Sequence, residues 1–310
     1  MQSNNKISYL DAGQIDRGRP AGRPPKTNRK IEFMKKVLRA AQYPAPRWTA
    51  QKVWAEFTRP GRTRWNEKQE ALVEQAHVDM FDYQGTTLTR YRWGSEGPKV
   101  LLVHGWRSKI VDFRKLIETL VNQGFVVEGV DFRAHGRSEG SHSALPEFYD
   151  ALTQHHKDWG PYHAVMGYSL GGLASGLMTA HLAKELQPQQ LFLFAAPPYP
   201  YYFFEDIINE LNLGKRVLKR FAGFVEEYYN REIHWWDLRS YAEHLNHLDV
   251  HLIYDEHDET VPLTRGQQLL EHLPEASFLH GKGLGHYKII SHEGILDYVT
   301  RNLKVAELVR

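Results

Sequence analysis

The chain of 310 residues contains no cysteine at all. It therefore cannot hold a disulfide framework, a thiolate metal site or a cysteine nucleophile. It also has no apolar run long enough to span a bilayer, and its first residues, from Met1 to Lys6, lack the charged-then-apolar layout of a secretory signal. These absences predict a cytoplasmic protein without a transmembrane segment.

The formal net charge of the whole chain is also small, at +2. It is unevenly distributed, because residues 1–30 carry seven Lys or Arg and two Asp. The remaining residues then hold 32 basic and 35 acidic side chains, so the body of the protein is close to neutral. A near-neutral body produces no overall field directed at nucleic acid.

The basic N-terminal segment has two interpretations. It contains Arg17-Gly18-Arg19-Pro20, which resembles the core of an AT-hook, a motif that binds the DNA minor groove through arginines. Alternatively, a Pro-, Gly- and Arg-rich leader is typical of a disordered tail. We favour the second interpretation, since one short basic segment within residues 17–30 is a weak signal for nucleic acid. Residues 1–30 are therefore predicted to be a disordered basic tail.

Hydrophobic residues make up 42% of the chain and aromatic residues 12%, enough for one large core. Residues 31–75 show apolar residues at helical spacing and are predicted to form a helical extension. From residue 76 onward, apolar strand-like runs alternate with helical patterns, which predicts an α/β fold with a mainly parallel sheet covered by helices on both faces. The predicted core covers residues 76–196 and 248–310, interrupted by an aromatic-rich helical insertion, or lid, at residues 197–247.

The stretch Gly167-Tyr168-Ser169-Leu170-Gly171-Gly172 lies between a short apolar run and a helical pattern. Gly-x-Ser-x-Gly in that position is typical of a nucleophile elbow, a turn so tight that only small residues fit beside the serine. Such a turn exposes the Ser169 hydroxyl at the end of a sheet. The sequence therefore predicts Ser169 as a nucleophile.

A serine hydroxyl needs a base, and the base needs an orienting acid. His286 follows the last predicted strand in a glycine-flanked loop, so we predict it as the base. The acid should follow an earlier strand, where Asp258 stands three residues before Val261-Pro262. Asp258 is our prediction, with Asp255 as the second candidate.

An oxyanion hole needs two main-chain donors aimed at one point. Leu170, directly after the nucleophile, supplies one of the two N–H groups. The second is predicted to be the N–H of Trp106, in the loop after the first central strand. The Trp106 indole would line the acyl side of the pocket, and His104 would only shape the turn.

In these motifs the chain resembles the α/β-hydrolase fold superfamily, in its serine esterase and lysophospholipase-like branch. The resemblance covers residue 76 to the C-terminus, and it departs from the branch at Ala134, where glycine is common. It is carried by the turn at Trp106, the elbow, the order Ser169, Asp258, His286, and the segment Asp131-Phe132-Arg133-Ala134-His135-Gly136-Arg137-Ser138. We read Asp131 and His135 as structural.

The resemblance implies a serine hydrolase that acts on carboxylic esters through an acyl-enzyme, with a small-molecule ester as its partner and no cofactor. A thioesterase or acyltransferase of the same fold is the nearest alternative, and a non-catalytic protein with a DNA-binding basic arm is a remote one. The aromatic insertion favours apolar or uncharged substrates. Candidate pocket residues are Trp106, Tyr168, Tyr199, Tyr202 and Phe203.

A metal site is not expected, although His244 and His247 would share a helix face. The third nearby histidine, His251, lies in the following predicted strand, and no carboxylate stands at an informative spacing. Acyl chain, leaving group and oligomeric state are not determined by the sequence.

Overall fold

The computed structural model describes residues 6–13 and 29–304. Their contacts divide them into two compact units. The first comprises described residues 6–13, 60–198 and 238–304, and it contains the β-sheet; the second comprises 29–59 and 199–237, and it is helical. The basic motif at residues 17–20 lies outside the described residues.

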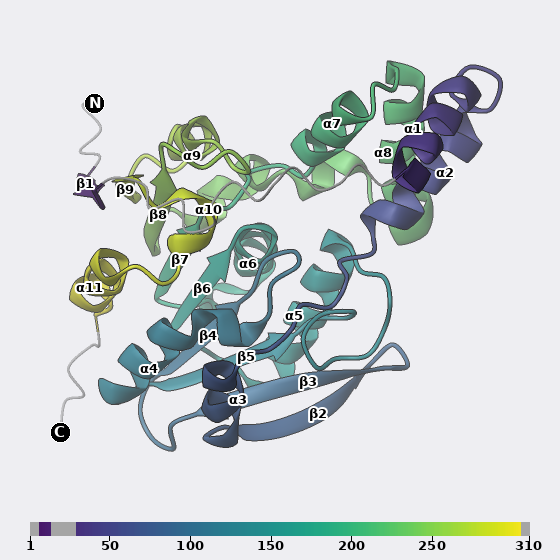
Figure 1. Cartoon of the computed structure of the whole chain (residues 1–310). Helices are drawn as coiled ribbons and strands as arrows, with labels where there is room; N and C mark the ends of the chain where they lie inside the picture. The colour runs from purple at the N-terminus through teal and green to yellow at the C-terminus, as the bar shows by residue number, and fades with distance from the viewer. Residues whose placement is uncertain (1–5, 14–28, 305–310) are drawn as a thin grey trace. The chain divides into compact units, whose positions relative to one another are not determined.

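Within the described part of the chain, nine strands form one sheet in the order β1-β9-β8-β7-β6-β4-β5-β3-β2 (Figure 1). In this spatial order the seven strands from β1 through β9, β8, β7, β6 and β4 to β5 are parallel to one another, whereas β3 pairs antiparallel with both β5 and β2. The strands are β1 (Ile7–Asp11), β2 (His77–Tyr83), β3 (Thr86–Trp93), β4 (Lys99–Val103), β5 (Val126–Asp131), β6 (Ala164–Tyr168), β7 (Gln190–Phe194), β8 (Asp249–Asp255) and β9 (Ser277–Lys282). The predicted mainly parallel sheet is confirmed.

Central strands are buried on both sides, as their continuous apolar sequences require. Every residue of β5, β6 and β7 is buried, and Val100 to Val103 of β4 are fully inaccessible. The hairpin between β2 and β3 turns through Gln84 and Gly85, both with positive φ (50° and 75°), which suits a two-residue turn.

Helices flank this sheet, as the α/β prediction requires. Among them, α6 packs against α5, and α4 packs against α11. The α-helices of the first unit are α3 (Glu67–Glu74), α4 (Arg114–Asn122), α5 (Leu145–Trp159), α6 (Leu170–His181), α9 (Leu263–Leu270), α10 (Gly285–Lys288) and α11 (Glu293–Asn302), with 3-10 turns at Ile110–Phe113, Lys184–Leu186 and Leu238–Leu245.

The second unit joins segments that are far apart in the sequence. Its elements are α1 (Arg29–Ala41), α2 (Pro46–Phe57), α7 (Tyr201–Glu210), α8 (Lys215–Tyr229) and a 3-10 turn at Ile233–Trp236. The ring of Trp54 on α2 lies 5.2 Å from that of Phe221 on α8, centroid to centroid. The side chain of Gln42 accepts a hydrogen bond from the N–H of Gly214 (2.7 Å). Aromatic packing and hydrogen bonding therefore hold α1 and α2 against the helices of the insertion.

Three segments differ from the sequence-based division. Residues 7–11, predicted as part of a disordered tail, form β1 alongside β9, because edge pairing uses main-chain groups and needs no apolar pattern of its own. Helix α3 belongs to the first unit, where the carbonyl of Leu72 accepts the indole N–H of Trp93 (2.8 Å). Leu238–Leu245 also belongs there, with Leu238 packed against Gly176 of α6.

The strand order places a switch point beside β4. From β4 the chain moves to β5 on one side and then to β6 on the other. In open α/β sheets, ligands bind in the crevice outside the carboxyl ends of the strands at such a point. The loops that follow β4 and β6 are therefore the expected location of a ligand site.

Candidate active site

Ser169 lies immediately after β6 and immediately before α6, with φ +52° and ψ −124°. A non-glycine residue in this conformation is strained, and such strain is concentrated at functional turns. The neighbouring glycines are sterically required: a Cβ on Gly171 would lie 2.2 Å from the carbonyl oxygen of His104, and one on Gly167 would lie 2.6 Å from Ser175 Oγ. The local sequence thus folds as a tight strand-to-helix turn, and the nucleophilic role of Ser169 stays a prediction.

The structure brings the three predicted residues together from three strand ends. His286 Nε2 lies 3.1 Å from Ser169 Oγ, and His286 Nδ1 lies 2.7 Å from Asp258 Oδ2. The other carboxylate oxygen of Asp258 accepts the N–H groups of Thr260 and Val261, both at 2.8 Å. With Nδ1–H donating to Asp258, the Nε2 atom of His286 is left as an acceptor for the Ser169 hydroxyl proton.

The main chain beside Ser169 comes from the loop after β4. A Cβ on Gly105 would lie 2.9 Å from Ser169 Cβ, so this loop passes directly against the serine. Arg107, with φ +57°, donates its N–H to His135 Nε2 (3.2 Å), whereas Trp106 precedes it in the turn. Leu170 begins α6, and the first N–H groups of a helix have no partner within the helix. Trp106 therefore follows Gly105 in this loop and Leu170 follows Ser169 at the start of α6, and their role as oxyanion donors stays a prediction.

Buried histidines brace that turn. His104 donates from Nδ1 to the carbonyl of Gly105 (2.8 Å), and its Nε2 accepts the N–H of Phe132 (3.1 Å). Burial lowers the pKa of His104 to about 4. Burial, together with the neighbouring His104, lowers the pKa of His135 to about 3. Both rings are therefore neutral at pH 7 and can act as hydrogen-bond acceptors for main-chain N–H groups.

Asp131 ties the same region to the sheet. Its carboxylate accepts the N–H groups of Ile110 (3.0 Å) and Arg137 (2.9 Å) and the hydroxyl of Tyr91 (2.9 Å). Burial raises the pKa of the Asp131 carboxyl, while these hydrogen bonds oppose that rise. These contacts are with the scaffold, in line with the structural reading of Asp131.

Asp255, the second candidate for the acid, has other partners. Its carboxylate accepts the main-chain N–H groups of His257, Leu284 and Gly285. A carboxylate at the end of a strand gives no sequence signal for whether it faces an imidazole or a backbone loop, so the sequence offered Asp255 only as the second candidate for the acid.

The predicted pocket residues fall in different units. The half-buried Trp106 ring lies 5.2 Å from the ring of His135, and the Tyr168 hydroxyl donates to the carbonyl of His286 (3.1 Å). Tyr199, Tyr202 and Phe203 belong to the second unit, so their role in a pocket stays a prediction.

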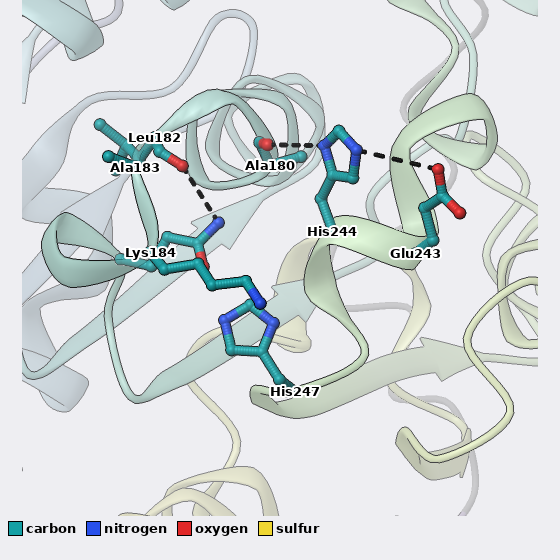
Figure 2. Close-up of a pocket in the computed structure, with 8 residues that line it drawn as sticks. Ala180, Leu182, Ala183, Lys184, Glu243, His244 and His247 are labelled. Atoms are coloured by element: carbon teal, nitrogen blue, oxygen red, sulfur yellow. Dashed lines mark hydrogen bonds and ion pairs between the residues drawn. The ribbon is translucent and has the colours of Figure 1, made fainter.

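A separate cavity of about 450 Å³ lies at the C-terminal end of α6 (Figure 2). Ser169 is at the opposite end of this helix of 12 residues, about 18 Å away along its axis. His244 lines the cavity, where its Nδ1–H donates to the carbonyl of Ala180 (3.1 Å), and His247 lies nearby. The third histidine of the sequence cluster, His251, contacts the hydroxyl of Tyr298 (3.0 Å) instead.

Residues 6–13 and 29–304 contain no group of three or more His, Asp or Glu side chains that could hold a metal ion. None of the helices in this described part of the chain is long and apolar enough to cross a membrane.

Comparisons with known sequences match parts of the chain. A family model described as "Serine aminopeptidase, S33" matches residues 95–222. Two human proteins, serine hydrolase-like protein and serine hydrolase-like protein 2, are each 30% identical to this chain over 92 residues. That match covers 27% of this chain and only 44% and 29% of the two relatives, so the chain spans less than half of either.

Solved structures match over a longer range. An esterase from Pyrococcus furiosus has a TM-score of 0.58 and 19% identity, covering 79% of this chain and 100% of that one. A thioesterase domain from the curacin biosynthetic pathway has a TM-score of 0.53 and 16% identity over 73% of this chain and 99% of its own. Mouse alpha/beta hydrolase domain-containing protein 10 has a TM-score of 0.55 and 15% identity, covering 74% and 97%. At these identities the likeness concerns the fold.

Proposed function

The chain belongs to the α/β-hydrolase fold superfamily, and on this premise we propose that it is a serine hydrolase of carboxylic esters. The observation that carries the proposal is the hydrogen-bonded series from Ser169 through His286 to Asp258, with distances of 3.1 and 2.7 Å. A series of this kind lets a proton leave the serine hydroxyl as its oxygen attacks a carbonyl carbon.

The proposed reaction has two halves. In the first, Ser169 Oγ attacks the ester carbonyl while His286 Nε2 takes the hydroxyl proton, and the proton then passes to the departing alcohol. In the second, His286 Nε2 takes a proton from a water molecule as the water oxygen attacks the acyl carbon. His286 then returns this proton to Ser169 Oγ as the bond between Oγ and the acyl carbon breaks and the carboxylic acid leaves. Asp258 holds the imidazole and stabilises its positive charge in both halves.

Negative charge develops on the carbonyl oxygen in both tetrahedral intermediates. We assign its stabilisation to the N–H groups of Trp106, in the loop after β4, and of Leu170, at the start of α6. Removing one donor of this kind reduces turnover by about a hundred- to a thousandfold in other hydrolases. These main-chain donors need no cofactor.

The substrate class is the finer part of the proposal. We propose apolar or uncharged acyl substrates, because residues 197–247 are rich in aromatic side chains and the body of the chain is close to neutral. Ester hydrolysis is favoured over thioester hydrolysis or acyl transfer only by the sequence resemblance, so a chain-length series of p-nitrophenyl esters, compared with acyl thioesters, measures the preference.

Labelling of the full chain by a fluorophosphonate tests the mechanism. The probe should modify Ser169, and Ser169→Ala should abolish labelling and lower ester turnover by roughly a million-fold. Ser141→Ala is the matched control, because Ser141 Oγ also contacts a histidine, His142 Nδ1 (2.9 Å), at an exposed position. Unlabelled wild-type protein, or labelling that survives Ser169→Ala, would contradict the proposal.

A further inference from the structure

Residues 283–286, here called the histidine loop, lead from β9 into α10, where His286 is the second residue. This loop is held by the side chains of Asp255, the last residue of β8, and of His257, two residues further on. Gly283 donates its N–H to His257 Nδ1 (3.2 Å), Leu284 donates to Asp255 Oδ2 (3.0 Å) and Gly285 donates to Asp255 Oδ1 (2.9 Å). Three consecutive main-chain donors before His286 are therefore bound by two side chains.

Asp255 depends on this loop as much as the loop depends on Asp255. The residue is fully inaccessible, and its carboxylate also accepts the N–H of His257 (2.9 Å). A buried carboxylate is unfavourable unless hydrogen bonds replace its lost hydration. Two of its three main-chain donors come from the histidine loop, so displacing the loop would leave the charge poorly satisfied.

The local backbone alone does not fix the loop. Gly283 and Gly285 have φ of +90° and +59°, a conformation that glycine enters and leaves with little strain. A loop with two such residues needs external contacts to hold one geometry. Asp255 supplies them from the β8 side.

Tyr168 supplies a contact from the other side. Its hydroxyl donates to the carbonyl of His286 (3.1 Å), and its ring lies 5.0 Å from the imidazole, centroid to centroid. Tyr168 is the last residue of β6, directly before Ser169, and is only 4% exposed. It therefore links the strand that bears the nucleophile to the loop that bears the base.

We propose that Asp255 and Tyr168 are positioning residues that clamp the histidine loop and so set the distance between His286 Nε2 and Ser169 Oγ. The inference rests on the proposed function. Both residues act through the loop, Asp255 on its N–H groups and Tyr168 on its carbonyl. The clamp gives Asp255 a task distinct from that of Asp258, although both stand in the same sequence segment.

The first test replaces Asp255 with asparagine, which has a similar shape but one acceptor oxygen fewer. We expect fluorophosphonate labelling of Ser169 to slow by roughly ten- to a hundredfold, the effect of misplacing a catalytic group by about an ångström. Amide hydrogen exchange at Leu284 and Gly285 should become faster in the same variant. The control is Asp249→Asn, at the other end of β8, where the carboxylate binds Lys304 Nζ (2.9 Å). The Asp249→Asn variant should be less stable than wild type but should be labelled at the wild-type rate.

The second test is Tyr168→Phe, which removes one hydrogen bond and should slow labelling by roughly fivefold. Tyr298→Phe, which removes a hydroxyl next to His251, is its control. Because both clamp residues act on one loop, the double variant Asp255→Asn with Tyr168→Phe should slow labelling by less than the product of the two single effects.

The outcomes separate the two proposals. Wild-type protein that is never labelled refutes the serine hydrolase function. Wild-type protein that is labelled, with Asp255→Asn reacting as fast as Asp249→Asn, refutes the clamp alone. If Asp255→Asn does not fold, Tyr168→Phe provides the test. The clamp is refuted if the Tyr168→Phe variant is labelled as fast as its control, Tyr298→Phe.

Discussion

Asp258 Oδ2 lies 2.7 Å from His286 Nδ1, and the side chains of the two residues are only 0% and 9% exposed. A charge-assisted hydrogen bond in a site shielded from water is strong and fixes which nitrogen of the ring carries the proton. The same carboxylate is anchored through its second oxygen to the N–H groups of Thr260 and Val261. Asp258 is thus both held in place and available to His286.

Replacing Asp258 with asparagine should therefore change chemistry more than stability. The amide would place an N–H group against His286 Nδ1 and favour the tautomer that cannot accept the Ser169 proton. Ester turnover should fall by about four orders of magnitude. Glu259→Gln, in the exposed part of the same loop, should retain turnover. Steady-state hydrolysis of a p-nitrophenyl ester measures both, and an Asp258→Asn variant within tenfold of wild type would contradict the assigned role.

The elbow glycine at 171 should not tolerate a methyl group. A Cβ there would lie 2.2 Å from the carbonyl oxygen of His104 and 2.7 Å from that of Val103, and neither main-chain atom can move freely. Gly171→Ala should destabilise the protein by about 1–3 kcal/mol or more and lower turnover. Gly223→Ala on α8, where a Cβ would meet nothing within 4 Å, should instead stabilise by roughly 0.5–1 kcal/mol. Urea unfolding of both variants tests the contrast, and equal signs would refute it.

Ala134 holds a left-handed conformation, with φ +65°. A left-handed backbone costs an alanine about 1–2 kcal/mol, and part of any gain from glycine is offset by the greater entropy of its unfolded chain. Ala134→Gly should therefore raise the unfolding free energy by up to about 1 kcal/mol while leaving turnover unchanged. The reverse is expected for Ala55→Gly, at an exposed position of α2, because glycine disfavours a helix; its unfolding free energy should fall by about 1 kcal/mol. Destabilisation by Ala134→Gly would show that the turn carries no strain.

Lowering the pH should destabilise the protein through its buried histidines. Burial holds the folded pKa of His135 at about 3, below its ordinary value of 6.5, so the unfolded chain binds more protons between these values. Stability from this residue is therefore complete above pH 6.5 and is lost as pH falls through that window, by up to about 1.4 kcal/mol per pH unit. Glu147, whose pKa is raised to about 7 by burial, acts in the opposite direction between pH 7 and 4.5.

Because these groups oppose one another, a difference between variants is the proper measurement. His135→Gln replaces the ring with a group that does not titrate but can still accept the N–H of Arg107. Its unfolding free energy should decline less than that of wild type between pH 7 and pH 5. Parallel slopes for the two proteins would show that His135 does not contribute to the pH dependence.

Much of the fold was predictable because the central strands carry their own signal. Runs such as Val100 to Val103 are apolar without alternation, and that pattern has few uses other than a strand buried on both faces. β1 was missed for the opposite reason: four of its five residues are exposed, and it is stabilised by main-chain pairing with β9.

The order of Ser169, Asp258 and His286 could likewise be predicted, since each follows a strand and carboxyl ends of parallel strands meet at one edge. The local sequence determined that a strained, glycine-lined turn would form around Ser169, because sterics between neighbouring residues act over a few bonds. The sequence ranked Asp258 before Asp255, and only the tertiary structure showed that Asp258 faces the imidazole while Asp255 faces the backbone of the loop. The two carboxylates are three residues apart, and their partners, an imidazole and a pair of backbone N–H groups, come from a loop about thirty residues later. Which acceptor meets which donor depends on the register of β8 and β9, a long-range relationship that no local pattern encodes.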